Sequence, residues 1–131
     1  MTGGGMLIQI AHLYATACLA VVFFQFALIG GAPLGPWTQG GQHEGALPIS
    51  GRVIAAFSVP VLIFQGLAIL SVAGFPGLDW PRWCGWAALG VSTVSAVLNG
   101  ITPSARERAV WFPVTLVMAG LAAYVMISTA R

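Results

Sequence analysis

Four long apolar segments of this chain contain no charged residue. The segments are residues 7–29, 53–73, 83–99 and 109–129, and the five arginines and three acidic residues all lie between them or at the C-terminal end. An α-helix of about 20 apolar residues crosses the roughly 30 Å hydrocarbon core of a bilayer. The segments therefore predict four transmembrane helices, of which the third is slightly short.

The composition agrees with a chain surrounded by lipid. Hydrophobic residues make up 58% of the chain and charged residues only 6%, too few to cover the surface of a soluble domain. We predict an all-α fold, a polytopic membrane four-helix bundle, in which residues 1–131 form one transmembrane domain and 31–50 the longest loop. The first segment is interpreted as a retained helix, because no basic residue precedes it and it exceeds the usual apolar core of a signal peptide, about 7–15 residues.

An even number of crossings places both termini on one side of the membrane. The loops after the first and third helices then carry Arg52, Arg106 and Arg108, against Arg82 and Arg131 on the other side. Because positively charged loops tend to stay cytoplasmic, this distribution favours a cytoplasmic location for these two loops. The net charge of +2 is too small to indicate a nucleic-acid partner.

The two halves of the chain share a short pattern. Residues 28–33 (LIGGAP) align with 98–103 (LNGITP), and residues 50–52 (SGR) align with 104–106 (SAR). This pattern predicts two tandem parallel helical-hairpin repeats, the first with a longer loop. Chance similarity between apolar segments is the alternative, and superposition of the halves decides between them.

Local signals predict where the helices begin and how they pack. Ser104, with Glu107 three residues later, forms a capping box for the fourth helix, and Ser50 is the matching N-cap of the second. Pro60 and Pro113 should bend their helices. Small residues at four-residue spacing in the third helix predict a close approach of the fourth. They are Cys84, Ala88, Ser92, Ala96 and Gly100, facing Thr115, Ala119 and Ala123.

The apolar segments contain few groups that could carry chemistry. They hold no carboxylate, which disfavours a proton-coupled exporter resembling the small multidrug-resistance transporters, and the absence of Cys-x-x-Cys disfavours thiol oxidoreductase chemistry. His12 and His43 belong to opposite sides of the membrane and cannot share a metal ion. We predict no metal site and no cofactor. The polar residues within the segments should face the bundle interior; they are Gln9, His12, Gln25, Gln65 and Asn99.

The glycine- and proline-rich loop 31–50 adjoins the charged starts of the second and fourth helices. An anionic headgroup could be bound there by arginines and helix N-termini. Alternatively, the loop folds as a lid held by pairing of Glu44 with an arginine. Trp111 either stacks on a ligand or belongs to an interfacial aromatic belt. The candidate ligand-binding residues are His43, Glu44, Arg52, Arg106, Glu107, Arg108 and Trp111.

Several of these residues lie in short sequence motifs that resemble the pattern of a protein family. Residues 31–35 (GAPLG), 40–43 (GGQH) and 47–48 (LP) with Arg52, followed by 104–108 (SARER) and 111–113 (WFP), resemble the pattern of an uncharacterised family of small four-helix bacterial integral membrane proteins. The resemblance covers nearly the whole chain. It implies a bacterial cell membrane and a four-helix bundle, but no activity, substrate or catalytic residue.

Two functional hypotheses follow. The first is a non-enzymatic accessory or assembling protein, whose partners besides membrane lipids are a second copy of the chain or another membrane protein. The second is a lipid or small-amphiphile binding protein, either a carrier or an enzyme, with its site at the face formed by loop 31–50. The sequence favours the first, because paired titratable groups are missing from the four segments.

Overall fold

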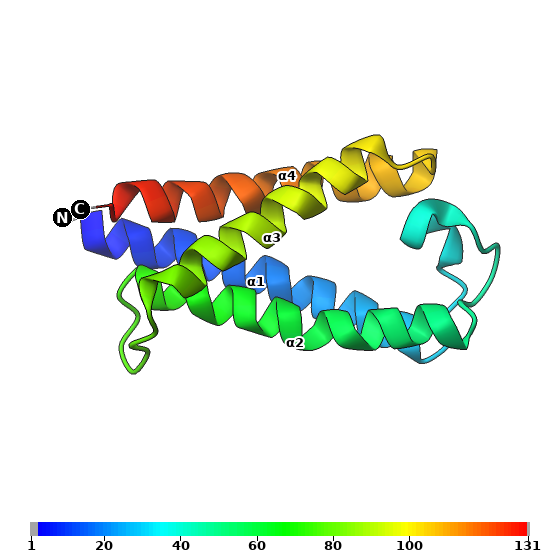
Figure 1. The fold of residues 1–131 in the computed structure, drawn as a ribbon, viewed down its shortest axis with the longest axis horizontal. Helices are drawn as coiled ribbons and strands as arrows, with labels where there is room; N and C mark the ends of the chain where they lie inside the picture. The colour runs from blue at the N-terminus through cyan, green and yellow to red at the C-terminus, as the bar shows by residue number, and fades with distance from the viewer. Residues whose placement is uncertain (1–2, 131) are drawn as a thin grey trace.

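Four antiparallel helices form an up-and-down bundle (Figure 1). The computed structural model describes residues 3–130. The helices are α1 (Gly3–Ile29), α2 (Ile49–Val72), α3 (Arg82–Ile101) and α4 (Ala105–Ser128). Loop one, residues 30–48, contains the short 3-10 helices η1 (Gly35–Trp37) and η2 (Gln39–Gly41). The predicted all-α four-helix bundle is confirmed, whereas the equivalence of its two hairpins stays a prediction.

The outer surface of the bundle is apolar on every helix. All four helices are long and apolar enough to cross a membrane. Large hydrophobic side chains are exposed around the whole bundle, including Phe23, Phe57, Ile101 and Ile127. Water would oppose such a surface, whereas lipid solvates it, so the chain is a multi-pass membrane protein.

The helices extend beyond the charge-free segments. Both α2 and α4 begin about one turn earlier than predicted, at Ile49 and Ala105, so that Arg52 and Arg106 lie within their first turns. Arginine is a good helix former, and a helix continues into the interfacial region where charges are solvated. A charge-free segment therefore indicates the part of a helix that lies in lipid, but not where the helix begins and ends. Pro60 and Pro113 lie within the continuous helices α2 and α4.

The predicted caps are only partly correct. The Ser104 hydroxyl accepts a hydrogen bond from the Glu107 backbone N–H at 3.1 Å, as expected for an N-cap. The Glu107 carboxylate, however, accepts a hydrogen bond from the Thr102 hydroxyl instead of completing the box with the Ser104 N–H. The prediction for Ser50 is wrong, because Pro48 occupies the N-cap position and α2 already starts at Ile49.

Four of the five small residues in the stripe of α3 are buried and Gly100 is half-buried, but only part of the stripe faces α4. Ser92 points instead toward α1 and α2, where it contacts Tyr14 and Gln65. At the C-terminal end of the stripe, a side chain on Gly100 would collide with the Phe112 ring of α4. The residues that α4 buries are not the three predicted ones, which are half-buried, but Glu107, Met118, Ala122, Val125 and Met126.

The core is distributed unevenly along the bundle. The main cluster of buried apolar side chains occupies the end where α1 begins and α4 ends. At the opposite end a small cluster of Leu28, Leu47 and Ala55 joins only α1, loop one and α2. The pair α1–α2 and the pair α3–α4 are therefore not held together by a continuous apolar core at the loop-one end.

Candidate ligand-binding cavity

A cavity of about 510 Å³ lies between the two helix pairs in the loop-one half of the bundle. Its volume is within the range of small-molecule sites, about 300–1,000 Å³. Figure 1 shows α3 crossing away from α2 toward α4, so that the ribbons of α2 and α3 diverge at this end. All four helices contribute one face to the wall, and loop one contributes Thr38.

The cavity is about as deep as one leaflet of a bilayer. Its lining extends from Glu107 to Met118 on α4 and from Ile54 to Gln65 on α2. Each stretch is about 16 Å long at roughly 1.5 Å per residue. This length matches one leaflet, since the whole hydrocarbon core is about 30 Å thick. One extended hydrocarbon chain fits this depth.

One side of the cavity is open toward lipid. Ile54, Phe57 and Val61 of α2 and Val91 of α3 line the cavity and are also exposed at the surface between these two helices. The residues at this opening are apolar. A ligand dissolved in the bilayer can therefore reach the cavity sideways without crossing water.

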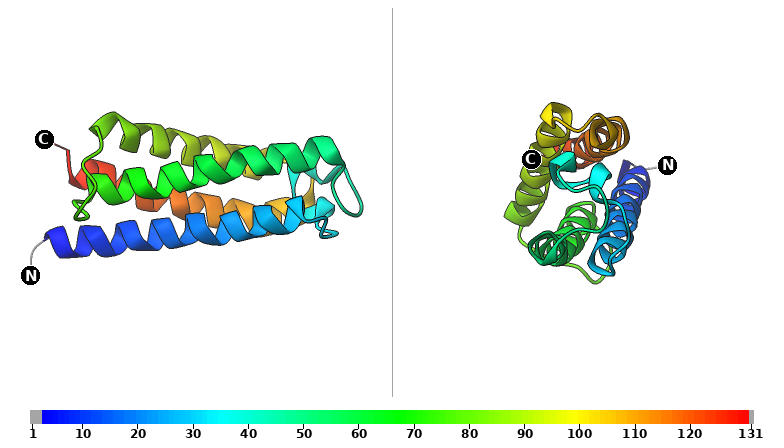
Figure 2. Two further views of the ribbon diagram at one scale, coloured as in Figure 1. Left: turned by 90° about the horizontal axis from the view of Figure 1, so that it is seen from below. Right: turned by 90° about the vertical axis from the view of Figure 1, so that its right-hand side faces the viewer.

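Loop one covers the end of the bundle that faces water, as the right panel of Figure 2 shows. The Ser104 hydroxyl donates to the Pro36 carbonyl at 2.9 Å, and the Arg106 guanidinium lies 5.2 Å from the centre of the Trp37 ring. The Gln39 amide donates to the Gly51 carbonyl of α2 at 2.9 Å. The loop is thus fastened to the starts of α2 and α4, and it closes the cavity toward the membrane surface.

Close backbone packing within loop one requires glycine at two positions. A side chain at Gly35 would collide with the carbonyl oxygens of His43 and Gly45, and the Gly35 N–H donates to the latter at 3.0 Å. Gly41 has a φ of 68° and lies against the Ser104 side chain. Loop one thus covers the bundle as the predicted lid would, but side-chain hydrogen bonds to backbone carbonyls and the Arg106–Trp37 contact fasten it, while Glu44 is exposed.

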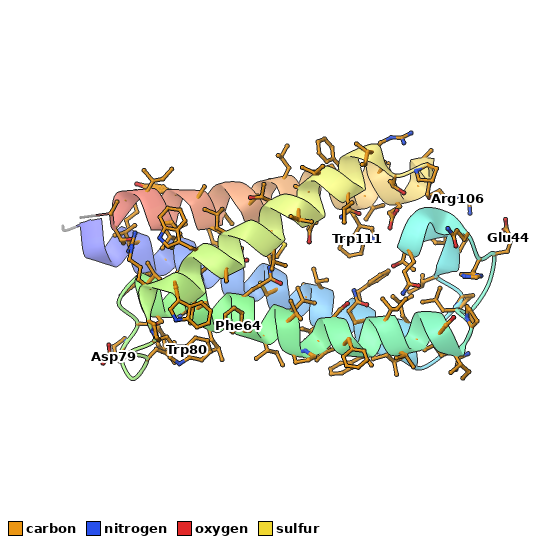
Figure 3. The ribbon with its side chains drawn as sticks, viewed as in Figure 1. Glu44, Phe64, Asp79, Trp80, Arg106 and Trp111 are labelled. Atoms are coloured by element: carbon orange, nitrogen blue, oxygen red, sulfur yellow. The ribbon has the colours of Figure 1, made fainter. Side chains whose placement is uncertain are left out.

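The seven residues predicted from the sequence do not form one cluster. Only Glu107 and Trp111 line the cavity. Arg52 donates to the Leu47 carbonyl at 2.9 Å and so holds the end of loop one, and Arg108 donates to the Thr102 carbonyl at 2.6 Å. The other three residues belong to the outer surface or to the body of loop one: Glu44 is exposed at the tip of the loop (Figure 3), Arg106 is exposed, and His43 is half-buried.

Glu107 is the charged residue at the loop-one end of the cavity. It is 9% exposed and lies in the first turn of α4, where the N-terminal end of the helix favours a negative charge. The Thr102 hydroxyl donates one hydrogen bond to it. A carboxylate has about four acceptor sites, so it retains capacity for a ligand.

Aromatic rings form the wall beside Glu107. Trp111 lies one turn further along α4 and extends into the space between the helix pairs (Figure 3). Its ring meets the edge of Phe24 from α1, with centroids 4.7 Å apart and planes at 61°. Both rings line the cavity, so Trp111 is positioned to contact a ligand.

A hydrogen-bonded triad lies at the inner end of the cavity, which two of its members, Gln65 and Ser92, line. The Gln65 amide of α2 donates to the Tyr14 hydroxyl of α1 at 3.0 Å and to the Ser92 hydroxyl of α3 at 3.1 Å. The Tyr14 and Ser92 hydroxyls are 2.5 Å apart. All three residues are almost fully buried. The sequence interpretation included Gln65 but assigned no polar partner to it.

Gln25, Gln65 and Asn99 line the cavity, as predicted for inward-facing polar residues, whereas Gln9 and His12 are exposed. The sequence interpretation did not connect the inward-facing residues with the polar stripes to which Gln65 and Asn99 belong. The stripes consist of Ser58 and Gln65 on α2, Ser92, Ser95 and Asn99 on α3, and Thr115 on α4. Their spacing of three, four or seven residues places each set on one helix face. This spacing is visible in the sequence and could have indicated a shared polar-lined space.

No group of three or more His, Cys, Asp or Glu side chains within residues 3–130 is arranged to hold a metal ion. Cys18 and Cys84 are free thiols buried in the core. In comparisons with known proteins, no family, no curated protein and no solved structure matches this chain. The cavity must therefore be interpreted from its own chemistry.

Proposed function

We propose that this protein binds a single-chain lipid or other small amphiphile, which reaches the cavity sideways from the bilayer. The cavity between the two helix pairs carries this proposal: half of its lining residues are polar, it is open toward lipid between α2 and α3, and loop one covers its aqueous end. An amphiphile places its chain along the apolar surfaces of α2 and its headgroup near loop one. This favours the second functional hypothesis over the first.

The accessory hypothesis has no comparable support. Exposed apolar side chains surround all four helices, as lipid alone requires, so they do not by themselves indicate a protein partner. The resemblance to bacterial membrane proteins and the distribution of arginines support a bacterial inner-membrane location with loop one on the cytoplasmic side.

Photolabelling tests the proposal. The protein is placed in phosphatidylcholine vesicles with three probes that share a diazirine-bearing dodecyl chain and differ in headgroup: an alcohol, an ammonium and a carboxylate. We expect at least one probe to label the cavity residues, and unlabelled amphiphile in excess to compete. Labels are located by mass spectrometry of the digested protein.

A pair of variants distinguishes the cavity from the lipid-facing surface. Ser95 lines the cavity, whereas Thr93, two residues away on α3, is exposed. Ser95→Phe should reduce cavity labelling by about tenfold or more, because the ring occupies the space of the ligand chain. Thr93→Phe should leave it unchanged. Uniform labelling of all lipid-facing surfaces, insensitive to Ser95→Phe, contradicts the proposal.

A further inference from the structure

The lining at the loop-one end of the cavity carries a single charged side chain, which is negative. Glu107 is the one charged residue among the described residues that line the cavity. A carboxylate withdrawn from water is unfavourable unless hydrogen bonds or an opposite charge compensate it. The Thr102 hydroxyl and the N-terminal end of α4 compensate part of this cost.

The neighbouring arginines are directed away from the cavity. Arg106 stacks on Trp37 at the outer surface, and Arg108 binds the Thr102 carbonyl at the end of α3. Both are exposed to solvent, so their effect on the cavity is screened more strongly than that of a buried charge. An anionic headgroup in the cavity would meet the Glu107 carboxylate and no lining cation.

The walls around Glu107 suit a positively charged headgroup. Trp111, one turn along α4 from Glu107, and Phe24, which contacts the Trp111 ring, line the same cavity as the carboxylate. Aromatic faces attract ammonium ions, most strongly where water is excluded. The side chains of Gln25 and Asn99 line the same cavity and offer amide oxygens as further acceptors.

We propose that the amphiphile held in this cavity is cationic, with an ammonium headgroup bound by the Glu107 carboxylate beside the contacting rings of Trp111 and Phe24 and a single hydrocarbon chain along α2. This inference rests on the proposed amphiphile-binding function and specifies its ligand class. The amine could belong to a free aliphatic amine or to the headgroup of a membrane lipid.

Comparison of the three headgroups tests the inference. Phosphatidylcholine vesicles have no net charge, so the bilayer does not itself concentrate the cationic probe. We expect the ammonium probe to label the cavity more strongly than the alcohol and the carboxylate probe least. Glu107→Gln should weaken labelling by the ammonium probe about tenfold or more, because it removes a charge-assisted hydrogen bond while retaining an acceptor for Thr102.

Glu44→Gln is the matched control. It removes the same charge at the same membrane face, but Glu44 is exposed at the tip of loop one, away from the cavity. We expect it to leave labelling by all three probes unchanged. Labelling of the Glu107→Gln variant by the alcohol probe shows whether that variant retains a folded cavity.

The outcomes separate this inference from the proposed function. If the alcohol or carboxylate probe labels the cavity as strongly as the ammonium probe, or Glu107→Gln leaves labelling by the ammonium probe unchanged, the cationic assignment is wrong although the cavity binds amphiphiles. If no probe labels the cavity, the proposed function itself fails. Competition by lysophosphatidylethanolamine would identify a membrane lipid as the source of the amine, and competition by dodecylamine alone a free amine.

Discussion

Tyr14, Gln65 and Ser92 join three helices by hydrogen bonds in the middle of the bundle. Within lipid such groups must bind one another, because neither water nor a hydrocarbon chain can replace the partner. Tyr14 and Cys18 lie one turn apart on α1 and both are buried, so the triad also adjoins the main apolar core. It marks the depth at which tight packing ends and the cavity begins.

Loss of one hydroxyl from this triad should destabilise the protein modestly. Tyr14→Phe leaves the ring in place but removes a partner of both Gln65 and Ser92. We expect a decrease of about 0.5–1.5 kcal/mol in the free energy of unfolding, measured by titration with denaturing detergent. Tyr124→Phe is the control, because Tyr124 is exposed on α4 and should be neutral. Equal effects of the two substitutions would mean that the triad contributes nothing.

At the scale of single elements, the path of α3 determines where the cavity forms. Near its N-terminal end, Gly85 lies directly against Met126 of α4 and Val72 of α2, so three helices are close together. Near its C-terminal end, Gly100 lets α3 approach the Phe112 ring of α4. Since α3 lies against α4 at this end, it diverges from α2 and leaves the lateral opening (Figure 1).

Two glycines of α3 should respond in opposite ways to the same substitution. Gly100→Ala should lower the free energy of unfolding by about 1 kcal/mol or more, because the new methyl group collides with the half-buried Phe112 ring. Gly90→Ala should be neutral or stabilising by up to about 1 kcal/mol, because Gly90 has open space around it and alanine favours the helix. The same detergent titration measures both. A stabilising effect of Gly100→Ala would exclude close α3–α4 packing at this position.

The whole molecule has a packed half and an open half. The half that contains the ends of the chain holds the main core, and Arg82 strengthens it by donating to the Thr129 hydroxyl at 2.9 Å and the Met126 carbonyl at 2.7 Å. The other half surrounds the cavity and is covered by loop one. In the proposed mode of binding, this asymmetry places the headgroup at the loop-one membrane face.

Cysteine labelling tests which side that face occupies. Glu44→Cys and Asp79→Cys each place one exposed thiol at opposite ends of the bundle, while the native Cys18 and Cys84 are buried. In intact cells, an impermeant maleimide should label the Asp79→Cys thiol, and the Glu44→Cys thiol only after permeabilisation. Labelling of both in intact cells would contradict the arrangement of loops one and two, and the reverse pattern would contradict a cytoplasmic loop one.

Corresponding residues of the two repeated motifs make different contacts in the structure. Ser104 caps α4 and binds the Pro36 carbonyl, whereas Ser50 lies within α2 and caps nothing. Likewise Arg106 stacks on Trp37, while Arg52 binds the Leu47 carbonyl. The corresponding residues thus have different partners. The origin of the two halves by duplication stays a prediction.

The number of helices, their type and their lipid surroundings were determined by the sequence alone. Hydropathy and charge are properties of each residue, and a charge-free segment of sufficient length has no other stable form in a bilayer. Glu107 and Trp111 could also be predicted as site residues from the sequence, because they lie at or near the charged start of a helix. Their association with Phe24, and the separation of Arg52, Arg106 and Arg108 from the cavity, were decided by tertiary structure. The rotation and crossing of each helix depend on contacts between residues far apart in the chain, such as Gly100 with Phe112 on the next helix and Tyr14 with Ser92 across the bundle. These contacts direct polar side chains into a shared space or out of it, and no local pattern contains that information.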